Sequence, residues 1–137
     1  ANNQQPWEFI IIEAQQLRDR IDEIHPYATM TKNAPVAIVV CGDLREPVPS
    51  TKWIQDCSAA CQNILLAAHA LHLGAVWCGI YPDQTRMEGF TRMFHLPEKI
   101  IPFALIPIGV PKSQPKSVNR FKKEKIHRDF WEKSYFP

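Results

Sequence analysis

The side chains best suited to chemistry are four cysteines and a closely spaced pair of histidines. Cys57 and Cys61 lie four residues apart, and His69 and His72 lie three apart, which on a helix would place each pair on one face. A metal site needs more ligands than either pair supplies, so no metal is expected. The cysteines show no Cys-x-x-Cys spacing and mostly lie in apolar runs, which favours core packing over disulfides.

Familiar catalytic and nucleotide-binding motifs are missing. The five glycines never form Gly-x-Gly, and no P-loop, Gly-x-Ser-x-Gly or His-Glu-x-x-His sequence occurs. We therefore expect no permanently bound dinucleotide, and we assign no residue as a general acid, general base or nucleophile.

The C-terminal segment is strongly basic. Residues 111–137 carry eight Lys or Arg against three acidic residues, a formal charge of +5, whereas residues 1–110 carry −3. Such a segment could hold a small anion, although a solvated basic tail is the alternative. The total of +2 is too small to favour nucleic acid or an acidic membrane as partner.

Length and composition indicate one globular domain over residues 1–137, with a peripheral tail from about 111. Apolar residues make up 45% and charged residues 22% of the 137, close to the globular average. No apolar run is long enough to cross a bilayer, and the first residues have no features of a secretory leader, so we expect a cytoplasmic protein.

Strands and helices are expected to alternate along the chain. Apolar, β-branched runs predict strands and three-to-four spacing predicts helices, with a loop over Leu44–Ser50. The strands are Trp7–Ile12, Val36–Cys41, Ala75–Ile80 and Phe103–Val110, and the helices are Ala14–Ile24, Thr51–Leu73 and one from Pro82 and Asp83 to about His95. This order implies a sheet with helices on both faces.

Several positions carry local expectations. Trp7–Ile12 should be a buried strand, and the helix over Thr51–Leu73 should be buried on nearly all sides, in the core or at a subunit interface, and capped by Gly74. Pro107 suits an edge or a bulge. Gly79 within a strand indicates either close approach of a ligand or a bulge without one.

Three segments in register carry a family resemblance. They are Asn3-Gln-Gln-Pro-Trp-Glu-Phe9, the stretch from Asp56 through Asn63 to Gly79-Ile-Tyr-Pro82, and Leu96–Pro111 followed by Arg120-Phe and Lys125-Ile-His127. The chain resembles the FMN-dependent nitroreductase family, particularly its short single-domain members, over nearly all of its length. The resemblance implies an α+β three-layer fold with a mixed, mainly four- to five-stranded sheet.

The resemblance also implies an FMN site at the interface of an obligate homodimer. The loop at the N-terminus would reach the flavin of the neighbouring subunit, the strand after the long helix would pass its backbone along the ring, and a basic C-terminal residue would meet the phosphate, with Arg120 the best match and Lys116 a weaker one. The implied flavin-binding residues are Ala1, Asn2, Asn3, Gln5, Trp77, Cys78, Gly79, Lys116 and Arg120.

The implied activity is a ping-pong reaction in which NADH or NADPH passes hydride to flavin N5 and the flavin then reduces a nitroaromatic, a quinone or a similar oxidant. Two alternatives stay open: a specialised member with another substrate, such as a reductive dehalogenase, and an FMN-binding protein without turnover.

The sequence departs from the family at two places. The family carries an Arg-x-Ser-x-Arg-type phosphate-binding segment upstream of the point where this sequence starts. Either the sequence begins inside a longer chain, or Arg120 and its neighbours hold most of the phosphate. His72 stands where the family usually has Gly, which should change the packing at the helix end.

Overall fold

A single antiparallel sheet forms the middle layer of the protein. The computed structural model describes residues 2–46, 51–113 and 116–136, and within these ranges the sheet has five strands in the order β1-β2-β5-β3, with β4 also on β5. The strands are β1 (Trp7–Ile12), β2 (Val36–Asp43), β3 (Gly74–Ala75), β4 (Cys78–Gly79) and β5 (Ile100–Gly109). The α+β class is confirmed, and every described ladder is antiparallel where a mixed sheet had been expected.

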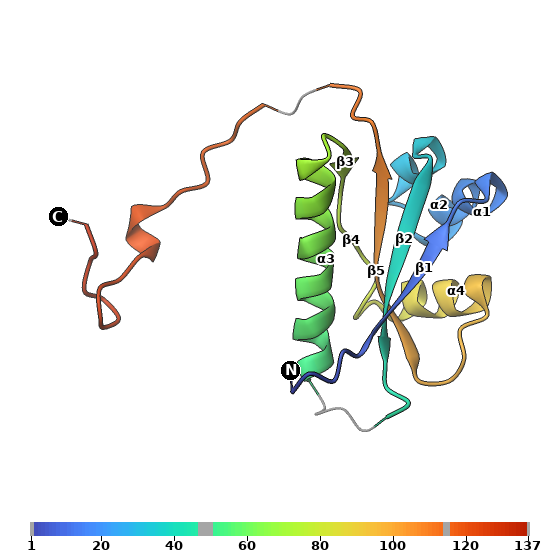
Figure 1. The fold of residues 1–137 in the computed structure, drawn as a ribbon, viewed down its shortest axis with the longest axis horizontal. Helices are drawn as coiled ribbons and strands as arrows, with labels where there is room; N and C mark the ends of the chain where they lie inside the picture. Colours follow the sequence, from blue (N-terminus) through green and yellow to red (C-terminus); the bar gives the residue numbers. More distant parts are fainter. Residues whose placement is uncertain (1, 47–50, 114–115, 137) are drawn as a thin grey trace.

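Helices cover both faces of this sheet, as expected (Figure 1). The long helix α3 (Lys52–Ala70) lies on one face, and α1 (Gln15–Asp19), α2 (Ile21–Ile24) and α4 (Gln84–Phe94) lie on the other. Each face has its own core. Trp53, Cys57 and Cys61 of α3 pack on the first face, whereas Ile21 and Phe90 pack with Cys41 and Cys78 on the second.

The cysteines are core residues, which confirms the expectation. All four are buried free thiols. Burial raises the pKa of Cys41, Cys57 and Cys61 to about 12, so these thiols stay protonated and unreactive near neutral pH.

The first strand is less buried than expected. In the part of the chain that the structure describes, it pairs only with β2 and lies at the sheet edge, where Phe9 is 44% exposed and Ile11 55% exposed. The prediction of a buried strand was therefore wrong, since an apolar run does not reveal whether both faces of a strand are covered.

The helix expected over Ala14–Ile24 is divided at Arg20. This residue has φ −94° and ψ −3°, and its N–H bonds to the carbonyl of Leu17, three residues back. The tighter turn separates α1 from α2. It accompanies burial of the Arg18 guanidinium, which donates to the carbonyl of Glu13.

For the longest helix, burial on nearly all sides in the core of one protomer is excluded, burial at a subunit interface stays a prediction, and the expected cap at Gly74 was wrong. Only Trp53, Cys57, Cys61 and Ala68 of α3 are buried in the protomer, and the small residues Ala67 and Ala70 are exposed. The cap is also placed differently, since Gly74 lies in β3 and His72 takes the left-handed conformation with φ 58°. The N–H of Leu73 bonds to the carbonyl of Ala68 at 2.8 Å and that of His72 to His69 at 3.0 Å, which is a Schellman motif.

The last helix agrees closely with the sequence. Helix α4 begins at Asp83, whose Oδ1 accepts the N–H of Arg86 at 3.0 Å. The 3₁₀ turns are Thr29–Asn33 (η1) and Lys123–Lys125 (η2). Beyond Val110 the chain leaves β5 and runs past the outer side of α3 (Figure 1). Of the helices described, none has both the length and the apolar character needed to cross a membrane.

Candidate functional site

The short strand β4, which carries Cys78 and Gly79 and directly follows Trp77, lies at a sheet edge. Among the described residues it pairs only with β5, where Cys78 faces Leu105 and Gly79 faces Ala104. The N–H of Ile80 bonds to the carbonyl of Phe103 at 3.1 Å, in the same register. Because hydrogen-bonding sides alternate along an antiparallel strand, the N–H and carbonyl of Gly79 point away from β5. The edge thus presents main-chain groups to whatever lies beside it.

Pro107 divides this edge strand in two. Continuing the shared register of β3 and β4 places Val76 opposite Pro107. The alternation makes this a hydrogen-bonded pair, but proline has no N–H to donate to Val76. The expected strand Ala75–Ile80 is therefore broken into β3 and β4. Pro107 itself lies in a central strand, which corrects the expectation of an edge or a bulge.

The carbonyl of Gly79 has two partners on the α2 and α4 face. Nε2 of His25 and Nη1 of Arg86 each lie 2.9 Å from this oxygen. His25 is 1% exposed, and burial is the main cause that lowers its pKa, with Arg86 acting in the same direction and Asp83 and the bond to Gly79 opposing it. The ring is therefore neutral with its proton on Nε2, while Nδ1 has no partner among the described residues.

The α-carbon of Gly79 borders open space. A Cβ built on this residue would meet no atom within 4 Å, unlike one on Gly42, which would lie 2.4 Å from Cε3 of Trp53. Alternation along the strand places this space on the α3 side, between Trp77 and Tyr81. The sequence left open a ligand or an empty bulge at Gly79, and unfilled space beside its α-carbon is compatible with both.

An aromatic cluster supports the strand from the α3 side. The ring centroid of Phe103 lies 5.8 Å from that of Trp77 and 6.1 Å from that of Tyr81, and Trp53 meets Tyr81 at 5.0 Å. The half-buried side chain of Trp77 thus packs against the core on the α3 side, while Cys78 is buried on the opposite face.

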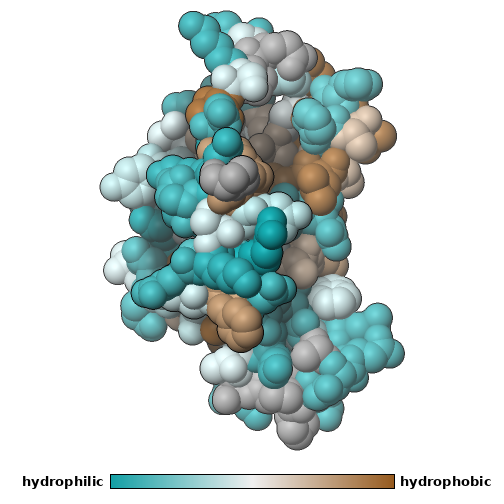
Figure 2. All heavy atoms as spheres, turned by 90° about the vertical axis from the view of Figure 1, so that its left-hand side faces the viewer, coloured by the Kyte–Doolittle hydropathy of each residue, from teal (hydrophilic) through white to brown (hydrophobic). Residues whose placement is uncertain are grey.

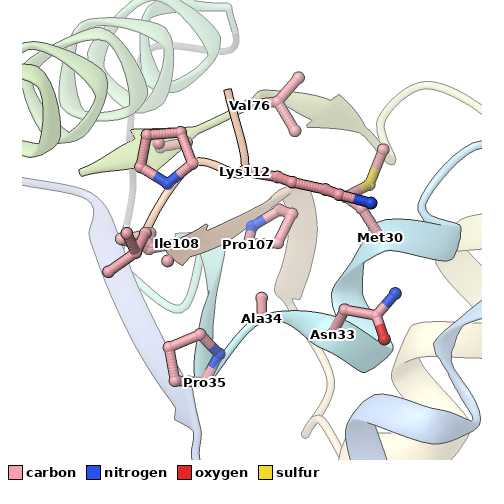
Figure 3. Close-up of a pocket in the computed structure, with 13 residues that line it drawn as sticks. Met30, Asn33, Ala34, Pro35, Val76, Pro107, Ile108 and Lys112 are labelled. Atoms are coloured by element: carbon pink, nitrogen blue, oxygen red, sulfur yellow. The ribbon is translucent and has the colours of Figure 1, made fainter. Parts of the chain in front are cut away.

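A pocket of about 410 Å³ opens beside Val76, at the other end of the divided strand. Its walls are mostly apolar and come from η1 and the two residues after it, from β3, and from the end of β5 with the residues that follow. The side chain of Lys112 reaches past Val76 toward Met30, and Asn33 adds an amide (Figure 3). Sequence reasoning missed Met30, Asn33 and Lys112 as pocket residues, because only the fold brings them together.

The remaining candidates lie apart from this strand within one chain. Asn2, Asn3 and Gln5 are exposed near the start of α3, and all three have positive φ, between 51° and 55° (Figure 1). Lys116 and Arg120 are exposed in the tail beyond α3. Ala1 lies outside the described residues. One protomer therefore does not bring the implied ring-binding and phosphate-binding groups together.

No group of three or more His, Cys, Asp or Glu side chains among the described residues could hold a metal ion. His69 and His72 instead line a second hollow of about 390 Å³ with Leu65 and Pro111.

Comparison with known proteins identifies the relationship. The model of the family described as "Nitroreductase family" matches residues 25–110, which include β2 to β5 and three of the nine implied site residues, Trp77, Cys78 and Gly79. The chain belongs to the nitroreductase family. The resemblance read from the sequence is thereby confirmed, and this nitroreductase-family protein is an oxidoreductase.

Similar proteins cover nearly all of the nitroreductase-family chain. A relative from Methanothermobacter thermautotrophicus, with the provisional name NADH dehydrogenase/NAD(P)H nitroreductase, is 48% identical over 96% of this chain and 69% of its own length. A crystal structure from Parabacteroides distasonis with the same provisional name is 40% identical, with a TM-score of 0.89, over 96% of this chain and 77% of that one.

A third comparison concerns the fold alone. The FMN-dependent nitroreductase of Clostridium difficile superposes with a TM-score of 0.86, over 96% of this chain and 79% of that one, at 24% identity.

Proposed function

We propose that the protein is a homodimeric FMN-dependent oxidoreductase that takes hydride from NADH or NADPH and reduces a nitroaromatic, a quinone or a similar small oxidant by a ping-pong mechanism. The observation that carries the proposal is the open space at Gly79, beside an edge strand whose main-chain N–H points away from β5. Bound FMN would supply the hydride-accepting centre and the electrons for the second half-reaction.

Residues of the edge strand would hold the ring. The Gly79 N–H would donate to it, and the missing Cβ lets the main chain come close. Trp77 and Cys78 would contribute backbone while their side chains stay in the two cores. These residues would position the flavin ring and exclude water from it rather than transfer protons, in keeping with the absence of a familiar catalytic motif.

Basic residues of the tail would hold the phosphate. Arg120 carries a planar guanidinium suited to two phosphate oxygens, and Lys116 adds a second positive charge nearby in sequence. Both are exposed and lie beyond α3 in one protomer, which supports a site completed across two subunits. Ala1, Asn2, Asn3 and Gln5 would reach the ring of the partner subunit.

An apolar surface supports the dimer. The side of the molecule that carries α3 and the tail has brown, hydrophobic patches among polar residues (Figure 2). Exposed large apolar residues of these elements are Leu66, Leu71, Val118, Phe121, Phe130, Trp131 and Tyr135. Exposed apolar area of this kind is typical of protein interfaces. A location in the cytoplasm stays a prediction from the sequence.

Reconstitution with FMN tests the proposal. The purified full chain should retain FMN after gel filtration, and the flavin absorbance should bleach anaerobically with NADH or NADPH and recover when a quinone is added. Retained flavin that neither nucleotide reduces would favour an FMN-binding protein without turnover. Failure to retain FMN would overturn the proposal.

A further inference from the structure

Two donors from two different helices meet on one main-chain oxygen. His25 follows α2 and Arg86 lies in the first turn of α4, and each donates to the Gly79 carbonyl over 2.9 Å. His25 is 54 residues away from Gly79 in sequence, so the contact depends on the tertiary fold. An edge-strand carbonyl that points away from its ladder would otherwise be left to water.

The guanidinium of Arg86 is itself held in place. Its Nε lies 3.5 Å from Oδ2 of Asp83, and its Cζ lies 5.5 Å from the centroid of the Tyr27 ring. The His25 ring meets the same tyrosine edge to face, with centroids 6.4 Å apart. The two donors are therefore fixed relative to each other as well as to Gly79.

Holding the carbonyl also orients the adjacent peptide groups. Carbonyl and N–H of one strand residue point to the same side, so fixing the Gly79 carbonyl fixes the direction of its N–H. The break at Pro107 removes ladder support at Val76, three residues away, which leaves the orientation of β4 more dependent on these side-chain bonds.

We infer that His25 and Arg86 are positioning residues, which hold the Gly79 carbonyl so that the N–H of Gly79 faces the flavin and which keep a positive charge one hydrogen bond from the flavin-binding strand. This inference rests on the proposed FMN site. A fixed donor should strengthen FMN binding, and the charge of Arg86 should favour the reduced, more negative flavin.

Substitution of Arg86 separates positioning from a purely structural role. Arg86→Met keeps the aliphatic stem and removes the donor, whereas Arg86→Lys keeps a charged donor. Arg92→Met is the matched control, because Arg92 lies on the same helix and its ion pair is with Glu88, at the surface. For each protein we would measure the Kd for FMN, the midpoint potential of the bound flavin and the Tm of the apoprotein.

We expect Arg86→Met to raise the Kd for FMN by about tenfold, as for loss of a hydrogen bond to a charged group, and to make the midpoint potential more negative. Arg86→Lys should restore most of the wild-type FMN affinity and midpoint potential, and Arg92→Met should change neither quantity. His25→Gln, which keeps a side-chain donor, should bind FMN more tightly than His25→Phe.

The outcomes distinguish this inference from the proposed function. Wild-type protein that binds FMN, with an Arg86→Met variant of unchanged Kd and potential, would overturn the inference alone. Arg86→Met could instead lower both the FMN affinity and the apoprotein Tm while the midpoint potential stays unchanged and Arg86→Lys restores nothing. That result would identify a structural role for Arg86 and would also overturn the inference. Wild-type protein that binds no FMN would overturn both. Should Arg86→Met not fold, Arg86→Gln, which removes the charge and keeps a neutral donor, should still make the midpoint potential more negative, and an unchanged potential would overturn the inference.

Discussion

Nε2 of His25 lies 2.9 Å from the carbonyl oxygen of Gly79, while Nδ1 of the same buried ring has no partner among the described residues. Protonation would place a second N–H, without an acceptor, beside the charged Arg86. The pKa of His25 is lowered from 6.5, mainly by burial. The folded state therefore binds this proton less readily than the unfolded state does.

The free energy of unfolding should consequently fall as the pH is lowered below 6.5 and through the folded-state pKa of His25. Above pH 6.5 the His25 ring is largely neutral in both the folded and the unfolded state, so its contribution to the free energy of unfolding is complete. Urea unfolding at a series of pH values measures how steeply the free energy of unfolding changes with pH. His25→Gln should reduce this slope. Arg45 lowers the pKa of Asp43 from 3.8, so this carboxyl changes the free energy of unfolding only at lower pH. An equal slope in the variant would contradict the assignment.

Gly79→Ala should separate binding from folding. The new Cβ would meet no atom within 4 Å, so the free energy of unfolding of the apoprotein should change little. The same methyl would enter the space proposed for the ring and raise the Kd for FMN by about tenfold or more, equivalent to roughly 1.4 kcal/mol. Fluorescence titration and thermal unfolding provide the two readings.

Gly42→Ala is the opposite control. Its Cβ would lie 2.4 Å from Trp53, so this variant should lose stability. Unchanged FMN affinity in Gly79→Ala would show that the ring does not approach this residue.

His72→Gly should stabilise the protein. His72 occupies the left-handed position of the Schellman motif that ends α3, where a side chain costs about 1 kcal/mol relative to glycine. We expect the free energy of unfolding to rise by about that amount. His69→Gly, inside the helix, should lower it by about 1 kcal/mol. A loss of stability in His72→Gly would mean that the imidazole makes a compensating contact.

Much of the fold could be predicted from local patterns. The runs at Trp7–Ile12 and Val36–Cys41 became strands because β-branched and aromatic side chains favour the extended backbone locally. Asp83 capped α4 through a contact that is local as well. The break at Arg20 and the exposure of β1 were missed, since both depend on what packs against the segment.

The candidate site was predictable only in part. The resemblance pointed to Gly79 as an FMN contact, which stays a prediction; a Cβ built there would meet no atom within 4 Å. His25, Arg86 and Lys112 were missed, because no spacing in the sequence indicates that they reach Gly79 or the pocket beside Val76. Pro107 did indicate a disrupted ladder, because proline has no N–H to donate. The ladder is broken at Val76, between β3 and β4, rather than in the strand that contains Pro107.

Leu66→Glu should disrupt the proposed dimer. Leu66 on α3 is 58% exposed in the protomer, so the charge should not disturb the core, but at a subunit interface it would be buried without a partner. Light scattering should report a monomer in place of a dimer, and FMN affinity should fall because the site is shared. Ile11→Glu, on the edge strand β1, serves as control. A wild-type protein that binds FMN as a monomer would contradict the shared site.

Arg120→Ala tests the phosphate contact. Arg120 is exposed and lies in the tail outside both cores, so the free energy of unfolding should change little. If its guanidinium meets the phosphate, the Kd for FMN should rise by about tenfold or more, and affinity should become less sensitive to salt. Lys122→Ala removes a nearby exposed charge and is the matched control. Riboflavin, which lacks the phosphate, should bind the wild-type and Arg120→Ala proteins equally. Equal loss of affinity for FMN and riboflavin would place Arg120 at the ring rather than at the phosphate, and unchanged FMN affinity would remove it from the site.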